Sequence, residues 1–252
     1  MKTVPVRLRI RRTSGWQEYV VQMSPNAYVL DALEAASAQD KSLLFRHSCH
    51  HASCGSCGLR INGREALPCI TPISKMSKSH GILRLEPLRN FPITGDLLVD
   101  LGPFLRRLDL VHLPMIRDTE SNLKNPDGGR QINRLLNPMR GDVLEIPSGF
   151  NRMENCIECG LCVSACPVVG LDPQYAGPAL LAAASRVVAE PRQQDTGAVL
   201  RQVDHQHGLW RCHAAFECSE VCPANVDPAR EIMGLRSRLL RSSARRELKD
   251  NT

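Results

Sequence analysis

Aromatic residues are scarce in this sequence: Phe, Tyr and Trp together make up 4% of its 252 residues. A hydrophobic core must therefore consist mainly of Leu, Ile, Val and Ala, or be supported by bound metal, which contributes folding free energy. Because no basic–aromatic pattern accompanies the net charge of +6, we do not expect the protein to bind nucleic acid.

Long hydrophobic runs are also missing. A membrane-spanning helix needs about 20 mostly apolar residues. The longest apolar stretch, Pro178–Ala189, is shorter and includes Ser185 and Arg186. The first twelve residues lack the apolar core of a secretory signal. We therefore expect a chain in a reducing, cytosolic-type compartment, and if it works at a membrane, something else must anchor it.

Cysteine, in contrast, is abundant. The eleven cysteines form two groups, four between residues 49 and 69 and seven between residues 156 and 222. An odd number without a secretory signal argues against a disulfide scaffold and favours reduced thiols that bind metal. The stretch between the groups has no cysteine and contains a turn-rich segment at residues 125–129. This division predicts two domains, residues 1–104 and residues 105–252.

Hydrophobic periodicity predicts an α+β fold for the first domain. Short strands are expected where apolar and polar residues alternate, and a helix is expected through residues 29–36, with Asn26 as its N-cap. Two strands, a helix and a cysteine-rich loop that returns to strands predict a β-grasp ferredoxin fold. The predicted strands span residues 4–10, 19–23, 59–61 and 82–85.

The second domain is predicted to be all-α. Apolar residues have helical spacing through residues 97–110, 180–188 and 232–240. Proline and glycine interrupt the cysteine-bearing segments, so we expect these segments to form loops and short turns between the helices.

The first cysteine group has the spacing C-x4-C-x2-C followed by a fourth cysteine, which is typical of a plant-type [2Fe–2S] cluster. Small residues such as Gly55 let the loop turn tightly and leave backbone N–H groups free to bond the sulfides. Zinc is the alternative, but zinc sites usually pair two C-x2-C units and this group holds one. The predicted ligands are Cys49, Cys54, Cys57 and Cys69.

The remaining seven cysteines form one complete motif and one incomplete repeat. Residues 156–167 have the pattern C-x2-C-x2-C-x3-C-P of bacterial two-cluster ferredoxins, whose fourth cysteine binds the other cluster. Residues 212–223 repeat the pattern with Ala215 in place of the second cysteine. Exchange of the fourth cysteines predicts one set of four and one set of three. The set of four is Cys156, Cys159, Cys162 and Cys222, and the set of three is Cys166, Cys212 and Cys218.

The set of four predicts a [4Fe–4S] cluster. In the set of three, an iron facing Ala215 would have no thiolate and would be lost easily, which predicts a [3Fe–4S] cluster. A labile [4Fe–4S] cluster with water or another ligand in place of the fourth cysteine is the alternative.

In this order and spacing, the motifs resemble the iron–sulfur subunits of the succinate dehydrogenase and fumarate reductase family. The resemblance covers nearly the whole chain. It implies a plant-type ferredoxin domain followed by a helical bacterial-type one, with [2Fe–2S], [4Fe–4S] and [3Fe–4S] clusters in that order. The segments that carry the resemblance are residues 47–49, 54–57, 91–93, 96–100, 156–167, 177–178, 210–213 and 218–223.

The resemblance also implies partners. The chain would relay single electrons between a quinone and a flavoprotein that holds FAD and the dicarboxylate site, and it contains no dinucleotide fingerprint of its own. An anchor subunit would hold it peripherally on the cytoplasmic face of a bacterial-type cell membrane.

The quinone is implied to bind beside the [3Fe–4S] cluster, near Pro167 and His213. Without the resemblance, His213 would be an ordinary loop histidine. Ubiquinone-linked relatives often have tryptophans shortly after the Cys-Pro pair, where this chain has Gly170 and Leu171, so we predict menaquinone. His213 is more typical of dehydrogenases, so the physiological direction stays open.

Three other functions fit parts of the pattern. A carrier for a heterodisulfide- or thiol-linked reductase would often have a further cysteine-rich domain, which is not found in the 30 residues after Cys222. A zinc protein would lack acid-labile sulfide. A free-standing soluble carrier would not co-purify with a flavoprotein and an anchor.

Overall fold

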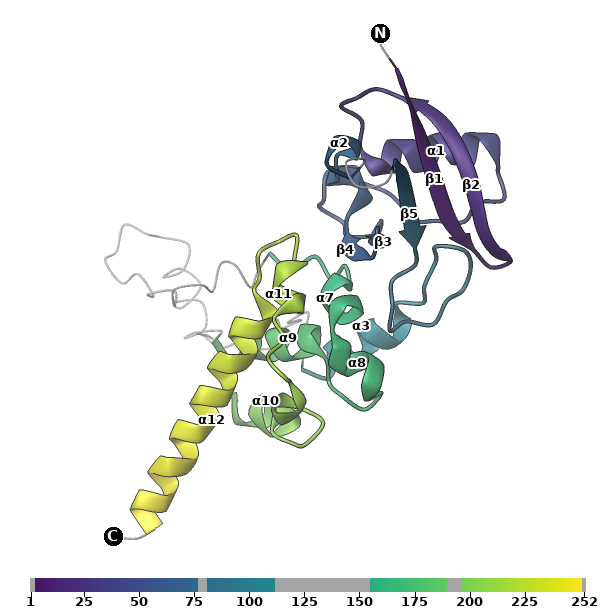
Figure 1. The fold of residues 1–252 in the computed structure, drawn as a ribbon. Helices are drawn as coiled ribbons and strands as arrows, with labels where there is room; N and C mark the ends of the chain where they lie inside the picture. The colour runs from purple at the N-terminus through teal and green to yellow at the C-terminus, as the bar shows by residue number, and fades with distance from the viewer. Residues whose placement is uncertain (1–2, 77–80, 112–154, 190–195, 251–252) are drawn as a thin grey trace, which may run out of the picture.

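In the computed structural model, the described residues are 3–76, 81–111, 155–189 and 196–250. Figure 1 shows a sheet-containing N-terminal part and a helical C-terminal part, from which helix α12 (Pro228–Asp250) projects. The turn-rich segment at residues 125–129 lies outside the described residues. Across the four described ranges, every helix is too short or too polar to span a membrane.

The N-terminal part is built on a mixed five-stranded sheet in the order β2-β1-β5-β3-β4. The pair β1 and β5 is parallel, and the other pairs are antiparallel. Alternation along β1 places Val6, Leu8 and Ile10 in the core. The strands are β1 (Val4–Arg12), β2 (Gly15–Met23), β3 (Leu59–Ile61), β4 (Arg64–Ala66) and β5 (Ile82–Glu86).

The four predicted strands are confirmed, and three are longer than predicted. Strand β2 begins at Gly15 rather than at residue 19, because it pairs with β1 as far as Arg12, across a tight turn. Strand β4 was not predicted, since three residues are too few to give a periodicity signal.

The predicted helix is present as α1 (Val29–Gln39), but its N-cap is Tyr28 and not Asn26. Asn26 lies in a turn in which the Ala27 N–H donates to the Ser24 carbonyl at 3.0 Å. The Tyr28 N–H instead donates to the Asp31 carboxylate at 2.8 Å. Two short helices, η1 (Pro68–Ile70) and α2 (Ile73–Met76), follow β4.

The helix predicted from residue 97 to residue 110 is wrong in its first five residues. Helix α3 spans Gly102–Asp109 and has a proline in its first turn, where proline is favoured. Leu97 lies before the helix, where its N–H donates to the Leu44 carbonyl at 3.1 Å. The domain boundary predicted after residue 104 falls inside α3, and it stays a prediction. Phe104 and Leu108 of α3 pack in the core of the helical part.

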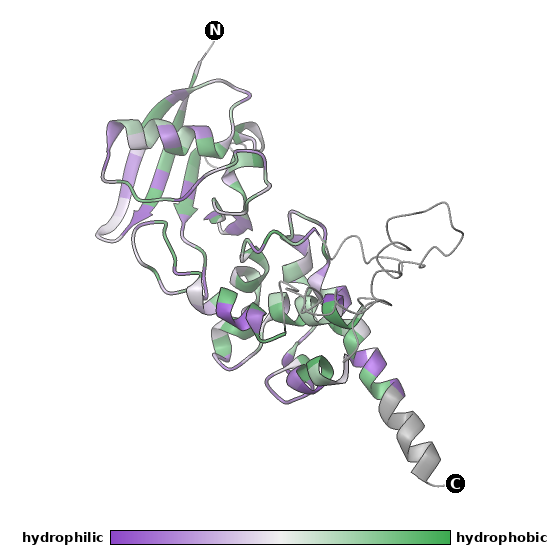
Figure 2. Ribbon diagram, turned by 180° about the vertical axis from the view of Figure 1, so that it is seen from behind, coloured by the Kyte–Doolittle hydropathy of each residue, from purple (hydrophilic) through white to green (hydrophobic). Residues whose placement is uncertain are grey.

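The C-terminal part is helical, as predicted. The predicted helices at 180–188 and 232–240 are present within the longer α9 (Pro178–Ala189) and α12. Helix α9 is buried on nearly all sides and packs against α12. Figure 2 shows the apolar residues that run through the middle of this part. The other elements are α7 (Leu161–Ala165), α8 (Pro167–Leu171), α10 (Thr196–Val203), η3 (Leu209–Arg211) and α11 (Glu217–Glu220).

The two parts meet through a buried polar contact. Ser164 Oγ on α7 donates to Glu65 on β4 at 2.9 Å and accepts the Arg89 N–H at 2.8 Å. Glu65 is 5% exposed and also pairs with the Arg89 guanidinium at 3.2 Å. Asn90 donates to the Cys166 carbonyl at 3.2 Å. Because a buried carboxylate is costly unless it is paired, this contact favours one alignment of the two parts.

Candidate metal centres

The first cysteine group lies on a tight loop between α1 and β3, and on η1. The loop backbone is left-handed at His50, Ala52 and Gly55, with φ of 61°, 60° and 68°. Cys57 on the loop and Cys69 on η1 are both buried. This arrangement lets a short segment direct several thiols to one place.

The thiols of this group interact with one another. Burial, with a smaller contribution from the neighbouring Cys69 and Cys54 thiols, raises the pKa of Cys57 to about 12. The His51 backbone N–H, and next the Cys54 N–H, lower the pKa of Cys49 to about 7. The Cys54 N–H lies 3.3 Å from Cys49 Sγ. The group therefore combines one thiol that ionises near neutral pH with one whose thiolate needs a compensating cation.

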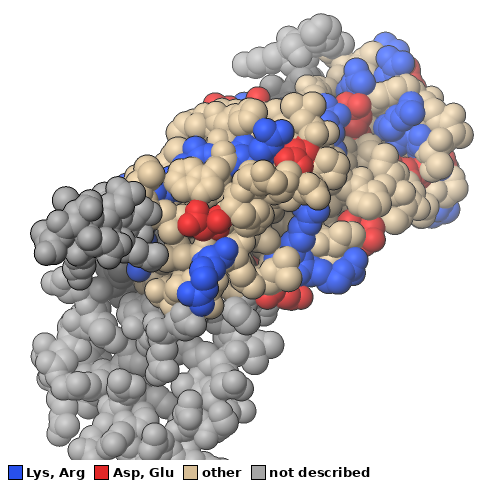
Figure 3. All heavy atoms as spheres, turned by 90° about the horizontal axis from the view of Figure 1, so that it is seen from below, with Lys and Arg blue, Asp and Glu red and all other residues tan. Residues whose placement is uncertain are grey.

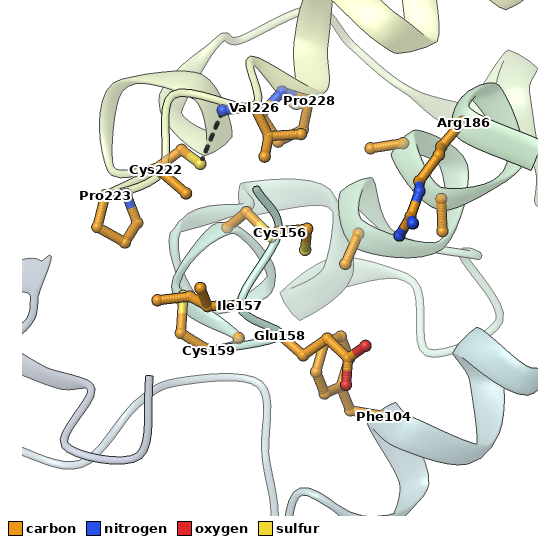
Figure 4. Close-up of a pocket in the computed structure, with 16 residues that line it drawn as sticks. Phe104, Cys156, Ile157, Glu158, Cys159, Arg186, Cys222, Pro223, Val226 and Pro228 are labelled. Atoms are coloured by element: carbon orange, nitrogen blue, oxygen red, sulfur yellow. Dashed lines mark hydrogen bonds between the residues drawn. The ribbon is translucent and has the colours of Figure 1, made fainter. Parts of the chain in front are cut away.

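The second group lines a cavity of about 600 Å³, part of which is open solvent, within the helical part. Figure 4 shows Cys156, Cys159 and Cys222 around this cavity, and Cys162 also lines it. Burial raises the pKa of Cys159 to about 11, and burial also raises the pKa of Cys162, next to the thiols of Cys159 and Cys156. Cys222, from the repeat, thus lies with three cysteines of the first motif.

Arg186 extends from α9 toward the same cavity (Figure 4). Its Nε is buried and has no hydrogen-bond partner among the residues that the structure describes. A buried N–H donor without an acceptor is costly. An iron–sulfur cluster with four thiolate ligands carries net negative charge and would offer this N–H group an acceptor. The residues around this cavity therefore fit a [4Fe–4S] cluster.

The third group brings Cys166 beside two cysteines of the repeat. Burial, followed by the thiols of Cys166 and Cys212, raises the pKa of Cys218 to about 12. Burial, followed by the same Cys212 and Cys166 thiols, raises the pKa of Tyr175, which is 1% exposed. The Ala214 N–H donates to Cys212 Sγ at 3.4 Å. Three neighbouring thiols beside the buried Tyr175 side chain are a donor set that fits a [3Fe–4S] cluster.

The internal repeat is visible in the backbone as well. Cys159 lies between Glu158 and Gly160, which have left-handed φ of 54° and 76°. Ala215 lies between Ala214 and Phe216, whose φ values are 56° and 63°. A short helix follows each segment, α7 in the first and α11 in the second. Ala215 thus takes the place of Cys159 in the repeat, with a methyl group instead of a thiol.

The three groups lie next to one another in chain order. A Cβ atom built on Gly55, in the first loop, would lie 2.7 Å from Cys159 Cβ in the second group. The thiol of Cys162, in the second group, interacts electrostatically with that of Cys218 in the third. The cysteine groups therefore form a continuous series through the molecule.

Pro167 and His213, the residues implied to lie near quinone, are both exposed. Exposed apolar side chains lie on the same segments: Leu171 is 80% exposed, Phe216 47% and Trp210 42%. The exposure of Trp210 and Phe216 could not be predicted from the sequence, because no motif marks an apolar residue as exposed. The position of Arg186 beside the cavity could not be predicted either, since the sequence shows it only as a charge in an apolar stretch.

Residues 6–106 match a 2Fe-2S iron-sulfur cluster binding domain, and residues 152–226 match a 4Fe-4S dicluster domain. The chain is 35% identical to the fumarate reductase iron-sulfur subunit of Haemophilus influenzae, over 85% of this chain and 82% of the relative. It is 30% identical to the succinate dehydrogenase iron-sulfur subunit of Coxiella burnetii, over 85% of each. Its structure is similar to a chain of the Mycobacterium smegmatis Sdh1 complex in the apo form, with a TM-score of 0.73, 25% identity, and coverage of 94% of this chain and 96% of that one.

Proposed function

Because this chain belongs to the family of iron–sulfur subunits of succinate dehydrogenases and fumarate reductases, we propose that it relays single electrons between a flavoprotein's dicarboxylate site and a membrane quinone. It is an electron-transfer subunit of an oxidoreductase. The continuous series of three cysteine groups carries the proposal, from the contact of Gly55 with Cys159 to the pair Cys162 and Cys218. Such a series suits electron transfer, which requires neighbouring redox centres.

The proposed ligand sets are those given by the motifs. The first group would hold [2Fe–2S], the set that includes Cys222 would hold [4Fe–4S], and the set that includes Cys166 would hold [3Fe–4S]. When bound, these clusters supply one-electron redox chemistry that protein side chains lack. The mixed sheet crossed by α1 supports a plant-type β-grasp ferredoxin domain, and the backbone repeat supports a bacterial-type dicluster domain.

Helix α12 orients the third group. Arg236 donates to the Cys212 carbonyl at 2.6 Å and, through Nε, to the Leu209 carbonyl at 2.9 Å. Its guanidinium also lies 5.8 Å from the centroid of the Trp210 ring. One arginine thus fixes the backbone before and at the first cysteine of the repeat.

The quinone is proposed to bind near Pro167 and His213, where the exposed Leu171, Trp210 and Phe216 offer apolar surface. The partners would be an FAD-containing flavoprotein and an anchor subunit that holds the chain on the cytoplasmic face of the membrane. On the face shown in Figure 3, basic and acidic side chains are interspersed among uncharged ones. That distribution does not suggest a nucleic-acid surface.

The fully loaded chain is expected to contain nine irons, two, four and three in the three clusters, with acid-labile sulfide. The oxidised protein should give a [3Fe–4S] paramagnetic signal. Iron and sulfide analysis with low-temperature magnetic resonance measures both. Near-stoichiometric zinc without acid-labile sulfide would contradict the whole assignment.

Menaquinone is expected to be preferred over ubiquinone. Gly170 and Leu171 stand where ubiquinone-linked relatives often have aromatic residues, and Leu171 is the most exposed large apolar residue in the described part of the chain. The measurement is turnover of the intact complex with each quinone at matched concentration. A clear preference for ubiquinone would show that this prediction is wrong.

A further inference from the structure

Three side chains of metal-binding type meet beside the first cysteine loop. Glu34 comes from α1, and His47 and His50 come from the loop on either side of Cys49. His47 Nδ1 lies 3.1 Å from His50 Nε2, and each nitrogen lies 3.3 Å from Glu34 Oε1. None of the three belongs to the cysteine sets described above.

These separations match those around a small divalent cation. A tetrahedral zinc ion with ligands at about 2.0–2.1 Å has ligand atoms about 3.3–3.4 Å apart. Two imidazoles and one carboxylate are a donor set that zinc takes in proteins, with water in the fourth position. We propose that Glu34, His47 and His50 form a binding site for a divalent transition cation such as zinc.

The three ligands are already held in place. The His47 ring stacks on Phe45, with centroids 5.1 Å apart and an interplanar angle of 20°. His50 has a left-handed φ of 61°, which L residues adopt only where the surroundings require it. Leu33, fully buried, fixes the helix that carries Glu34. The ligand side chains are 36–45% exposed, so a cation can reach them from solvent.

Within the described ranges, no fixed positive charge competes for the carboxylate. Considering the described residues only, Glu34 forms ion pairs with these two histidines and with no lysine or arginine. Arg46, which precedes His47, donates to the Val99 carbonyl instead. A divalent cation would therefore meet one negative charge and two imidazoles, a combination that favours its binding.

The site adjoins Cys49, a proposed ligand of [2Fe–2S]. Net charge near an iron–sulfur cluster is one of the factors that set its reduction potential, and positive charge stabilises the reduced state. A cation bound here raises the potential of that cluster. This consequence rests on the proposed function, whereas the cation site itself does not.

The test is a zinc titration of the untagged, cluster-loaded full chain, with zinc, iron and acid-labile sulfide counted in each sample. We expect one zinc per chain with all iron retained. Glu34→Gln keeps the shape of the side chain but removes its charge. Loss of an outer partner of a metal ligand costs about 10–100-fold in affinity, so loss of this ligand should weaken zinc binding by at least about 100-fold.

His51→Gln is the matched control, because His51 lies in the same loop but its ring contacts the Cys49 carbonyl rather than Glu34. It should leave zinc affinity unchanged. X-ray absorption at the zinc edge should show nitrogen and oxygen ligands without sulfur. A redox titration followed by magnetic resonance should show a higher [2Fe–2S] potential with zinc, and no shift in Glu34→Gln.

Equal zinc affinity in the wild type and in Glu34→Gln, or sulfur ligands around zinc, would overturn the site. If zinc binds as expected but the [2Fe–2S] reduction potential does not change, the proposed electrostatic effect of the site on the cluster would be overturned. Failure of the proposed function would be distinct, because iron and sulfide would then be missing from the same samples.

Discussion

Replacement of Ala215 by cysteine is expected to convert the third cluster from [3Fe–4S] to [4Fe–4S]. The left-handed residues on both sides of Ala215 match those around Cys159, so the new thiol should point as the Cys159 thiol does. Ala215 is exposed, and surface substitutions usually change stability by less than about 0.5 kcal/mol. The iron content should rise by one per chain, and the [3Fe–4S] signal should fall. Quinone reduction should slow, because the added thiolate and iron change the cluster's charge and potential.

Ala214→Cys is the control, since it adds a thiol to the same loop one residue away. It should leave the [3Fe–4S] signal in place. Iron analysis and low-temperature magnetic resonance on both variants are the measurements. If the Ala215→Cys protein folds and keeps an undiminished [3Fe–4S] signal, the backbone between Cys212 and Cys218 would have to set the cluster type instead.

Gly55→Ala is expected to destabilise the contact between the first and second cysteine groups. The new Cβ would lie 2.7 Å from Cys159 Cβ and 3.0 Å from the Ile157 carbonyl oxygen. Left-handed φ at a non-glycine residue costs about 1–2 kcal/mol, and overpacking adds about 1–3 kcal/mol. The free energy of unfolding should fall by about 2–5 kcal/mol. Electron transfer from the first cluster to the second should slow because the two loops must move apart.

Gly63→Ala separates the two causes. Gly63 has a φ of 86°, and a Cβ there meets nothing within 4 Å, so this variant should show only the conformational cost. Thermal unfolding, followed by loss of cluster absorbance, compares the stabilities of the two variants. Freeze-quench magnetic resonance reports how fast the first cluster is reoxidised. Equal losses of stability in Gly55→Ala and Gly63→Ala would contradict the steric explanation.

Local spacing explains what the sequence could predict. Cysteines that have two to four residues between them must converge if the loop is tight, so the motifs predicted which cysteines lie together. The exchange of Cys166 and Cys222 followed from the two-cluster pattern, and the structure brings these cysteines to the opposite groups. The assignment of individual clusters stays a prediction.

Contacts between distant segments explain what the sequence could not predict. The helix predicted to begin at residue 97 begins later because Leu97 packs in the hydrophobic core of the sheet-containing part and donates a hydrogen bond to the Leu44 carbonyl. Apolar spacing does not reveal such contacts. Glu65 joins the two parts of the molecule because it accepts a hydrogen bond from Ser164, which is about a hundred positions away in the chain. The meeting of Glu34 with His47 likewise depends on how α1 lies against the loop.

The crossing of Cys166 and Cys222 also has a consequence for biogenesis. Cys222 lines the cavity of the first motif, and Cys166 lies beside the cysteines of the repeat. The set of three is therefore complete only after residue 218 has been synthesised, and the set of four only after residue 222. A ribosome-bound chain that ends before residue 218 would offer incomplete sites to the iron–sulfur assembly machinery. Cluster insertion into the helical part should therefore follow synthesis of the repeat and be nearly concerted, whereas Cys49 to Cys69 can be loaded on a much shorter nascent chain.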